Sequence, residues 1–316
     1  MNKSLRFLGV ATAYSFALLL PTGVCAFQYD HEKDVVYGYK DGMALVMDVF
    51  APEVERNAGG VILVMAGGMN SNPIWSHQAA DRPDVQSLLG AGYTVFAVAH
   101  SSRPKYTVDD IRGDLPRAVR FIRHHAARFG VDPQCLGIMG HSSGAQMSLL
   151  TAAAPPPATV DAADPVDRES SRVQAVVAYY PAVDMLNFGQ PNTTILQHFR
   201  SQGRESAATF DFHIWDPETG RFERVVDREI RSEFFRRNSP LTHTTSKHPP
   251  VLIFHGDADE LVPIQQSELL TQRLREVGVP HKLIVAQGRG HGWPPVEAYQ
   301  AEVLEWFGEH LLGTER

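Results

Sequence analysis

The chain has 316 residues, enough for one large α/β domain or two small ones, and 43% of them are apolar, an ordinary share for a globular protein. Its formal net charge is −7, and the sequence has no run of Lys or Arg beyond isolated pairs. Because little basic surface is available to neutralise phosphates, these values argue against a nucleic-acid partner.

The first 26 residues have the layout of a secretory signal peptide. Lys3 and Arg6 give a positive start, residues 7–20 are mostly apolar, and small residues precede Phe27. The apolar run is too short to span a bilayer comfortably, and polar sequence follows it at once. We therefore predict cleavage after Ala26, a secreted or periplasmic protein, and no stable membrane anchor after cleavage.

A lipid anchor on Cys25 is the alternative interpretation of this segment. The preceding Thr-Gly-Val poorly matches the Leu-Ala-Gly type of residues that precede a lipid-bearing cysteine, so we favour simple export. Cleavage would leave Cys135 as the single cysteine, and a lone cysteine predicts no intramolecular disulfide.

Buried strands and amphipathic helices are predicted to alternate after the signal peptide. Two β-rich runs flank Asp41-Gly42, a dipeptide typical of hairpin turns. Further strands are predicted at 61–65, 93–98, 134–139, 173–180, 251–254 and 282–285. Helices are predicted at 83–89, 111–129, 145–150, 264–277 and 296–312. In the second of these helices, Pro116 should cause a kink, or a restart capped by Asp114.

This alternation predicts a single α/β domain at 27–316, with a mostly parallel, twisted sheet of about eight strands and helices on both faces. Residues 181–248 fit the pattern poorly and are predicted to form a small cap insertion, with a β-hairpin around 216–220 and a charged helix at 227–237. The aromatic residues of this insertion either stack on a substrate or form its own small core, and we favour the core. They are Phe188, Phe210, Phe212, Trp215 and Phe222.

Residues 140–144 read Gly-His-Ser-Ser-Gly and lie between a predicted strand and a predicted helix. In that context, Gly-x-Ser-x-Gly is typical of the tight turn that presents a nucleophilic serine above a sheet. The residues two before and two after the serine must be small, and the serine itself is strained. We predict that Ser142 is the nucleophile and that the backbone N–H of Ser143 meets a developing oxyanion.

A serine nucleophile needs a base to take its proton and a third group to orient that base. The loop after strand 251–254 contains Asp257 and Asp259, and the loop after the final strand contains His291. Chemistry gathers at the carboxyl ends of the strands in such sheets, so these loops are expected to lie near Ser142. Asp184, which follows strand 173–180, is an outside candidate for the acid.

Two further patterns make a family resemblance specific. Residues 255–263 match His-Gly-x-x-Asp-x-x-Val-Pro, and Gly-His-Gly follows at 290–292. With the serine motif, they resemble the α/β-hydrolase superfamily over roughly residues 40–312. Within it, the chain is similar to acetyl-xylan and feruloyl esterases and to prolyl-oligopeptidase-like, dienelactone-hydrolase-like carboxylesterases.

The resemblance implies a triad of Ser142, Asp259 and His291, with Asp257 less favoured as the acid. Near other strand ends, His141 and His255 are expected to be structural. His100 could line the pocket, but we expect it to be packed or solvated. No His/Asp/Glu group has convincing zinc spacing, so no metal is assigned, and the chemistry implied requires no cofactor.

The oxyanion hole is the point at which this chain departs from the superfamily. Many relatives carry His-Gly-Gly-Gly after the third strand, whereas residues 65–69 here read Met-Ala-Gly-Gly-Met. We predict that the hole is formed by the N–H of Ser143 and one N–H in the region of Gly68 and Met69. A plain strand-to-loop turn is the alternative.

Together these features predict a secreted serine esterase that uses an acyl-enzyme. Its expected substrates are small-molecule or polysaccharide esters, with acetyl or other short acyl groups on carbohydrate. A prolyl-oligopeptidase-type serine peptidase is one alternative, although only about 40 residues precede the region of resemblance. A non-catalytic binding protein of the same fold is the other, and the retained triad argues against it.

Overall fold

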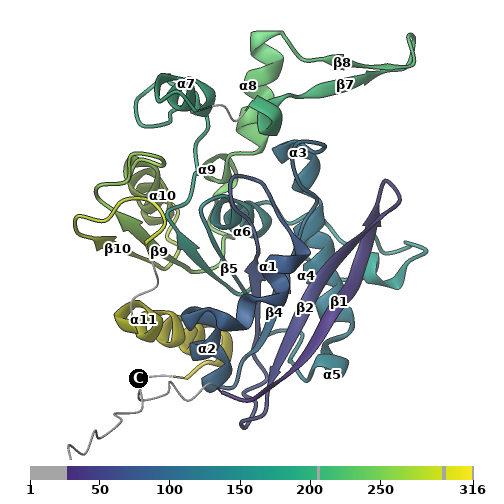
Figure 1. The fold of residues 1–316 in the computed structure, drawn as a ribbon, viewed down its shortest axis with the longest axis vertical. Coiled ribbons are helices and arrows are strands. Elements are labelled where there is room, and N and C mark those ends of the chain that lie inside the picture. Colours follow the sequence, from purple (N-terminus) through teal and green to yellow (C-terminus); the bar gives the residue numbers. More distant parts are fainter. Residues whose placement is uncertain (1–26, 205–206, 294–296, 315–316) are drawn as a thin grey trace, which may run out of the picture.

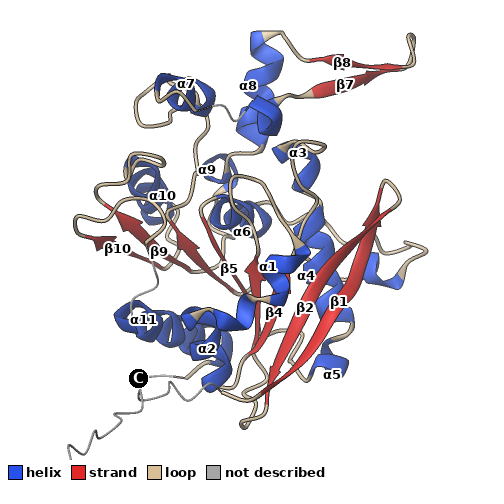
Figure 2. Cartoon of the chain, viewed as in Figure 1, coloured by secondary structure: helices blue, strands red, loops and turns tan. Residues whose placement is uncertain are grey.

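The computed structural model describes residues 27–204, 207–293 and 297–314, so the predicted signal peptide lies outside the described residues. An eight-stranded sheet runs through the molecule, with helices on both of its faces (Figure 1, Figure 2). Within these ranges, none of the helices combines the length and the apolarity needed to cross a membrane.

Only the first strands of the sheet are antiparallel. In order across the sheet, the strands are β1 (Tyr29–Lys40), β2 (Met43–Pro52), β4 (Thr94–Val98), β3 (Gly60–Val64), β5 (Leu136–His141), β6 (Ala175–Tyr179), β9 (Val251–Gly256) and β10 (His281–Ala286). β1 and β2 form the predicted hairpin and join β4 in antiparallel register, whereas every pairing from β4 to β10 is parallel. The predicted sheet of about eight mostly parallel strands is therefore confirmed.

Side chains of the central strands alternate between two apolar cores, one on each face. In β3, Ile62 and Val64 point into one core and Val61 and Leu63 into the other, and all four are buried. The first core contains side chains from α4 (Asp114–His124), α6 (Ser143–Ala153) and α10 (Gln265–Glu276). The second contains side chains from α2 (Pro83–Gly90) and α11 (Glu297–Phe307). Burial on both faces explains why these strands are continuous apolar runs.

The predicted helix at 111–129 is divided in the structure into α3 (Val108–Ile111), α4 and α5 (Ala126–Phe129). Its break lies at Gly113, which is the N-cap of α4, so the prediction of Asp114 as the cap is wrong. The Asp114 carboxylate instead accepts hydrogen bonds from Lys40 at 2.9 Å and from the Ser101 N–H at 2.8 Å. Pro116 causes no break because it lies in the first turn of α4, where an N–H has no acceptor within the helix.

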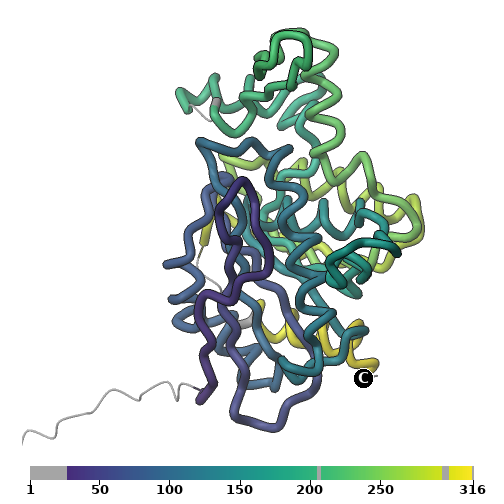
Figure 3. The backbone as a smooth tube through the Cα atoms, turned by 90° about the vertical axis from the view of Figure 1, so that its right-hand side faces the viewer, coloured from purple at the N-terminus to yellow at the C-terminus, as the bar shows by residue number. Residues whose placement is uncertain are grey.

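The segment 181–248, called the cap segment below, lies outside the eight-stranded sheet. Its elements are α7 (Ile195–Ser201), β7 (His213–Asp216), β8 (Arg221–Arg224), α8 (Arg228–Arg237) and α9 (Pro240–His243). Figure 1 and Figure 3 show α7, α8 and the β7–β8 hairpin at one end of the molecule, beyond the sheet. The hairpin and the charged helix are thus present where the sequence predicts them.

The aromatic side chains of the cap segment do not form one core. Phe210 and Phe212 pack with Phe234 and Phe235 of α8, with ring centroids 4.4–5.9 Å apart. Trp215 and Phe222 instead pair with each other on the hairpin, where they are 52% and 69% exposed. For these two residues, the predicted place in the core of the cap is wrong.

Candidate active site

Ser142 lies in the sharp turn between β5 and α6. Its backbone has φ 53° and ψ −119°, a conformation that is strained for a residue with a side chain. A Cβ added to Gly140 would lie 2.5 Å from the carbonyl carbon of Gly144, and one added to Gly144 would lie 2.8 Å from the carbonyl oxygen of Val64. Both distances are shorter than non-bonded atoms allow, so this turn requires glycine at both positions.

The structure brings together the three side chains that the sequence predicts as a triad. His291 Nδ1 lies 2.7 Å from Asp259 Oδ2, and His291 Nε2 lies 2.9 Å from Ser142 Oγ. A carboxylate only accepts hydrogen bonds, so Nδ1 carries the ring proton and Nε2 presents its lone pair to the serine hydroxyl. The ring is thus oriented to take a proton from Ser142. The catalytic roles of the three residues stay a prediction.

Asp259 lies in the loop after β9, where several groups contact its carboxylate. Oδ1 accepts from the N–H of Leu261 at 3.0 Å and of Val262 at 2.9 Å, while His255 Nε2 lies 3.4 Å from Oδ2. Burial by itself would raise the pKa of Asp259, but the imidazoles of His255 and His291 and the Val262 N–H outweigh it and hold the pKa well below its usual range. Asp259 therefore remains a carboxylate near neutral pH.

The two alternative acids lie away from the base. Asp257 is exposed, and its Oδ1 accepts from the Gly288 N–H at 2.5 Å. Asp184 accepts from the Leu186 N–H at 2.9 Å, within its own turn. Among the described contacts, neither carboxylate reaches His291. The structure therefore places Asp259, and not Asp257 or Asp184, beside His291.

Two of the histidines expected to be structural or packed are held by buried hydrogen bonds. The ring of His255 is fully buried, accepts from the Ser267 hydroxyl at 2.6 Å and donates to the Val262 carbonyl at 2.8 Å. His100 is also buried, and its Nδ1 donates to the Ser101 carbonyl at 2.6 Å. These bonds fix the ends of β9 and β4 without placing either ring in the catalytic cavity.

The predicted oxyanion donors lie on two elements. Ser143 is the first residue of α6, so its N–H has no acceptor within the helix. After β3, Gly67 and Asn70 exchange two backbone hydrogen bonds at 2.9 and 3.0 Å, and both residues between them have positive φ. The Met69 N–H donates to Ser143 Oγ at 3.1 Å. The Gly68 N–H has no acceptor among the described residues, which makes Gly68 the better second donor.

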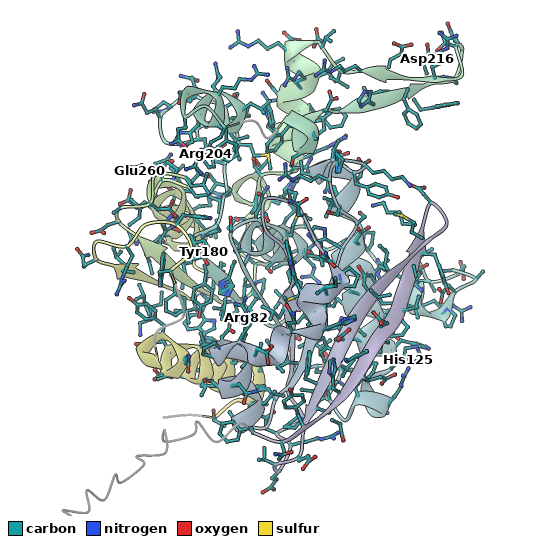
Figure 4. The ribbon with its side chains drawn as sticks, viewed as in Figure 1. Arg82, His125, Tyr180, Arg204, Asp216 and Glu260 are labelled. Carbon is teal, nitrogen blue, oxygen red and sulfur yellow. The ribbon has the colours of Figure 1, made fainter. Side chains whose placement is uncertain are left out.

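A cavity of about 480 Å³, called the catalytic cavity below, opens beside Ser142 and His291. The cap segment forms one of its walls with Ile195, Phe199, Arg204, Thr209 and Phe210. Figure 4 shows Arg204 on the cap side of this region and Tyr180 on the side of the sheet. Most of these wall residues were not predicted, because the cap segment has no periodic pattern that would point to one face.

A buried polar network that the sequence did not predict lies against the triad. Arg82 makes two hydrogen bonds to Asp84, at 3.0 and 2.7 Å, and donates to His141 Nε2 at 2.7 Å. Burial and the charge of Arg82 lower the pKa of His141 to about 3. The ring is therefore neutral, and its Nδ1–H faces the Tyr180 hydroxyl at 3.4 Å. The edge of the Tyr180 ring packs on His291, with centroids 4.6 Å apart.

One group of described residues has the composition of a metal site. Ligand atoms of Asp34, Asp48 and His77 lie within 4.8 Å of one another, on β1, β2 and α1 (Pro73–His77). Asp48 is fully buried, and its carboxylate accepts from His31 Nε2 at 2.6 Å and from the Asp34 N–H at 3.1 Å. These groups satisfy one another and lie outside the catalytic cavity, so we assign no metal to them.

Comparisons with known proteins point to ester hydrolases. The probable carboxylic ester hydrolase LipM of Mycobacterium tuberculosis is 25% identical over 251 residues, which are 79% of this chain and 53% of that protein. The probable isoprenylcysteine alpha-carbonyl methylesterase ICMEL1 of Arabidopsis thaliana is 23% identical over 303 residues, which are 92% of this chain and 60% of that protein. The chain thus spans little more than half the length of these curated relatives.

Solved structures share the fold. A truncated carbohydrate esterase from gut microbiota has a TM-score of 0.71 at 23% identity, over 91% of this chain and 98% of that one. A thermophilic esterase of Thermogutta terrifontis has a TM-score of 0.62 at 21% identity, over 90% and 92%. With the observed sheet, they confirm the predicted α/β-hydrolase fold. The BD-FAE family model matches residues 47–274, well over half of the chain, and the chain therefore belongs to the BD-FAE family.

Proposed function

We propose that the protein is a serine esterase that hydrolyses carboxylic esters through an acyl-enzyme on Ser142. The observation that carries the proposal is the hydrogen-bonded line from Asp259 through His291 to Ser142, with distances of 2.7 and 2.9 Å, at the edge of the catalytic cavity. The ester hydrolases among the curated relatives support the same chemistry.

The reaction follows from the geometry of this site. His291 Nε2 takes the proton of Ser142 as Oγ attacks the ester carbonyl carbon. The carbonyl oxygen becomes an oxyanion, which the N–H groups of Ser143 and Gly68 stabilise. His291 then gives the proton to the leaving alcohol, and a water molecule repeats the sequence on the acyl-enzyme to release the acid. Asp259 stabilises the imidazolium in both halves of the reaction.

Short acyl groups on carbohydrate are the substrates that we propose. A volume of about 480 Å³ and the apolar side chains of Ile195, Phe199 and Phe210 suit a small acyl group. Structures with the same fold include the gut carbohydrate esterase and an acetyl ester-xyloside bifunctional hydrolase from Caldicellulosiruptor lactoaceticus, which supports this class. The signal-like residues 1–26 support a secreted or periplasmic location.

Hydrolysis of a panel of esters tests the proposal. The panel contains p-nitrophenyl esters of increasing acyl length, acetylated xylan and methyl ferulate, and Ser142→Ala is the control. We expect turnover to be fastest with the shortest acyl chains and Ser142→Ala to fall to background. No turnover of any ester by the wild type would refute the esterase. Activity that survives in Ser142→Ala would refute the nucleophile, and a preference for long chains would refute the short-acyl specificity.

A further inference from the structure

A second cavity, of about 560 Å³, lies in the cap segment between α7 and α8. Figure 1 shows these two helices next to each other at the end of the molecule beyond the sheet. Arg200 of α7 and Arg228, Arg231 and Arg236 of α8 line the cavity, which we call the arginine cleft. Among the described residues, no carboxylate lines it.

The positive charge of the arginine cleft is not balanced by the fold. Arg236 pairs with Glu233 at 3.1 Å, whereas Arg200, Arg228 and Arg231 have no ion pair in the part of the chain that the structure describes. The four guanidinium groups line one cavity with no carboxylate among its described lining residues, so like charges are gathered there. A bound anion would relieve the repulsion between them.

Acidic residues near the cleft do not supply that anion. The Asp227 carboxylate accepts from the N–H groups of Glu229 and Ile230 at 2.9 Å and so caps α8. Glu229 and Glu233 are exposed and do not line the cleft. The arginines therefore form a local concentration of positive charge in a chain whose net charge is −7. This positive charge attracts anions to the cleft.

The remaining walls of the arginine cleft suit a sugar. The amide side chains of Asn192 and Gln197 line it beside the apolar side chains of Leu196 and Phe235. Amide groups bond to hydroxyls, apolar surface packs on the C–H face of a ring, and a guanidinium binds a carboxylate or a sulfate with two parallel hydrogen bonds. This mixture favours an acidic sugar over a bare inorganic anion.

Only one helix separates the arginine cleft from the catalytic cavity. Ile195 and Phe199 of α7 line the catalytic cavity, and Arg200 of the same helix lines the cleft. Phe210 on the catalytic side and Phe235 on the cleft side are in edge-to-face contact, with centroids 5.9 Å apart. A carbohydrate chain that places an ester in the catalytic cavity can therefore pass α7, which is about 10 Å across, and place a sugar a few residues further along in the cleft.

We propose that the arginine cleft binds a negatively charged sugar residue, a uronate or a sulfated sugar, of the polymer whose ester is cleaved at Ser142. The proposal rests on the esterase function proposed above and adds a substrate class to it, the esters of acidic polysaccharides. Uronate and sulfate present the same chemistry to arginine, and the experiment below separates them.

Direct binding is measured in the Ser142→Ala background, so that no probe is consumed. Calorimetric titration at low salt uses oligogalacturonate, a sulfated carrageenan oligosaccharide and a neutral xylo-oligosaccharide. We expect at least one anionic oligosaccharide to bind on the order of tenfold more tightly than the neutral one, with an affinity that falls as salt is added. The stronger of the two anionic probes identifies the charged group.

Two sets of substitutions with the same change in net charge locate the binding. The cleft variant carries Arg200→Gln, Arg228→Gln and Arg231→Gln. The control variant carries substitutions to Gln at three exposed basic residues outside the cleft, namely Lys33, Arg172 and Arg221. We expect the cleft variant to lose the preference for the anionic oligosaccharide and the control variant to keep it. Equal loss in both variants would show only a general charge effect and would overturn the proposal.

Activity measurements separate this inference from the proposed function. On p-nitrophenyl acetate, the cleft variant should match the wild type, because the substrate is too small to reach the cleft. When the binding experiment identifies uronate as the charged group, the KM of the cleft variant on acetylated glucuronoxylan should rise about tenfold, and carboxyl reduction of the polymer should abolish the difference.

Two binding results would contradict the proposed role of the arginine cleft. Equal binding of neutral and anionic oligosaccharides overturns it, as does tighter binding of a single-stranded DNA oligonucleotide than of either anionic sugar. The absence of any ester turnover would refute the proposed esterase function but would leave the binding result intact.

Discussion

The orientation of His291 depends on the group that Asp259 presents to its Nδ1. An aspartate accepts the Nδ1–H at 2.7 Å, whereas the amide nitrogen of an asparagine can donate to Nδ1 and so favour the tautomer with a proton on Nε2. That tautomer cannot accept the proton of Ser142. We predict that Asp259→Asn lowers kcat/KM on p-nitrophenyl acetate by roughly a thousandfold or more.

Asp257→Asn is the matched control, since Asp257 lies two residues away, is exposed and contacts Gly288. We expect it to keep kcat/KM within about threefold of the wild type, because surface substitutions are usually nearly neutral. A larger loss in Asp257→Asn than in Asp259→Asn would move the acid of the triad to Asp257.

The protonation of His141 makes the free energy of unfolding depend on pH. The unfolded chain takes up a proton at His141 below its ordinary pKa of 6.5, whereas the folded protein holds that pKa at about 3. The unfolded state therefore binds more protons between these values, and the free energy of unfolding falls as pH decreases through this window, by up to about 1.4 kcal/mol per pH unit. Above pH 6.5 the contribution is fully present.

We predict that His141→Gln, which retains an acceptor for Arg82, removes this part of the pH dependence. Between pH 7 and pH 5, urea unfolding should show the wild type losing roughly 2 kcal/mol more than the variant. The same loss in both proteins would mean that His141 is protonated in the folded state, contrary to its contact with Arg82.

The turn between β5 and α6 depends on close backbone packing. The Cβ of an alanine at position 140 would lie 2.5 Å from the carbonyl carbon of Gly144, and backbone cannot give way as a flexible side chain does. We predict that Gly140→Ala lowers the free energy of unfolding by about 1–3 kcal/mol and reduces activity, because Ser142 moves with the turn. Chemical denaturation and kcat measure the two effects.

Gly113→Ala is the control for this element. Gly113 has φ −83°, and no atom lies within 4 Å of the position of an added Cβ. Its stability should stay within about 0.5 kcal/mol of the wild type. If Gly140→Ala changed the stability as little as Gly113→Ala, the strained conformation of Ser142 would not depend on a glycine two residues before it.

Sequence alone was a good guide to the elements that are buried on both sides. The strands β3, β4, β5, β6 and β9 are mostly apolar runs because both of their faces are covered, and such runs predict strands directly. The break in the helix predicted at 111–129 was placed at the wrong residue. It lies at Gly113, which is the N-cap of α4 and has no side chain that could indicate a cap. The exposed pair Trp215 and Phe222 was misjudged, since the residues of a hairpin do not show whether it packs on the rest of the fold.

At the scale of the whole molecule, the order of the strands in the sheet brings the residues of the candidate active site together. β5, β6, β9 and β10 are neighbours and parallel, so the loops that carry Ser142, Tyr180, Asp259 and His291 meet at one edge. Motif order could predict that Ser142, Asp259 and His291 meet, because each of them follows a strand.

Contacts between segments that are distant in sequence were beyond prediction. Arg82 and His141 are 59 residues apart and share no spacing rule, and the arginine cleft forms only when α7 packs near α8. The same limit applies to the cap wall, where Ile195 and Phe199 face the catalytic cavity through tertiary packing.

Trapping of the acyl-enzyme tests whether Ser142 is the nucleophile. The protein is mixed with p-nitrophenyl acetate, quenched in acid during turnover, digested and analysed by mass spectrometry. We predict one acetyl group on the peptide that contains Ser142. It should be absent from Ser142→Ala and should accumulate with a burst of p-nitrophenolate. Turnover with no acetyl group at Ser142, or an acetyl group that forms at another residue at the same rate, would contradict this prediction.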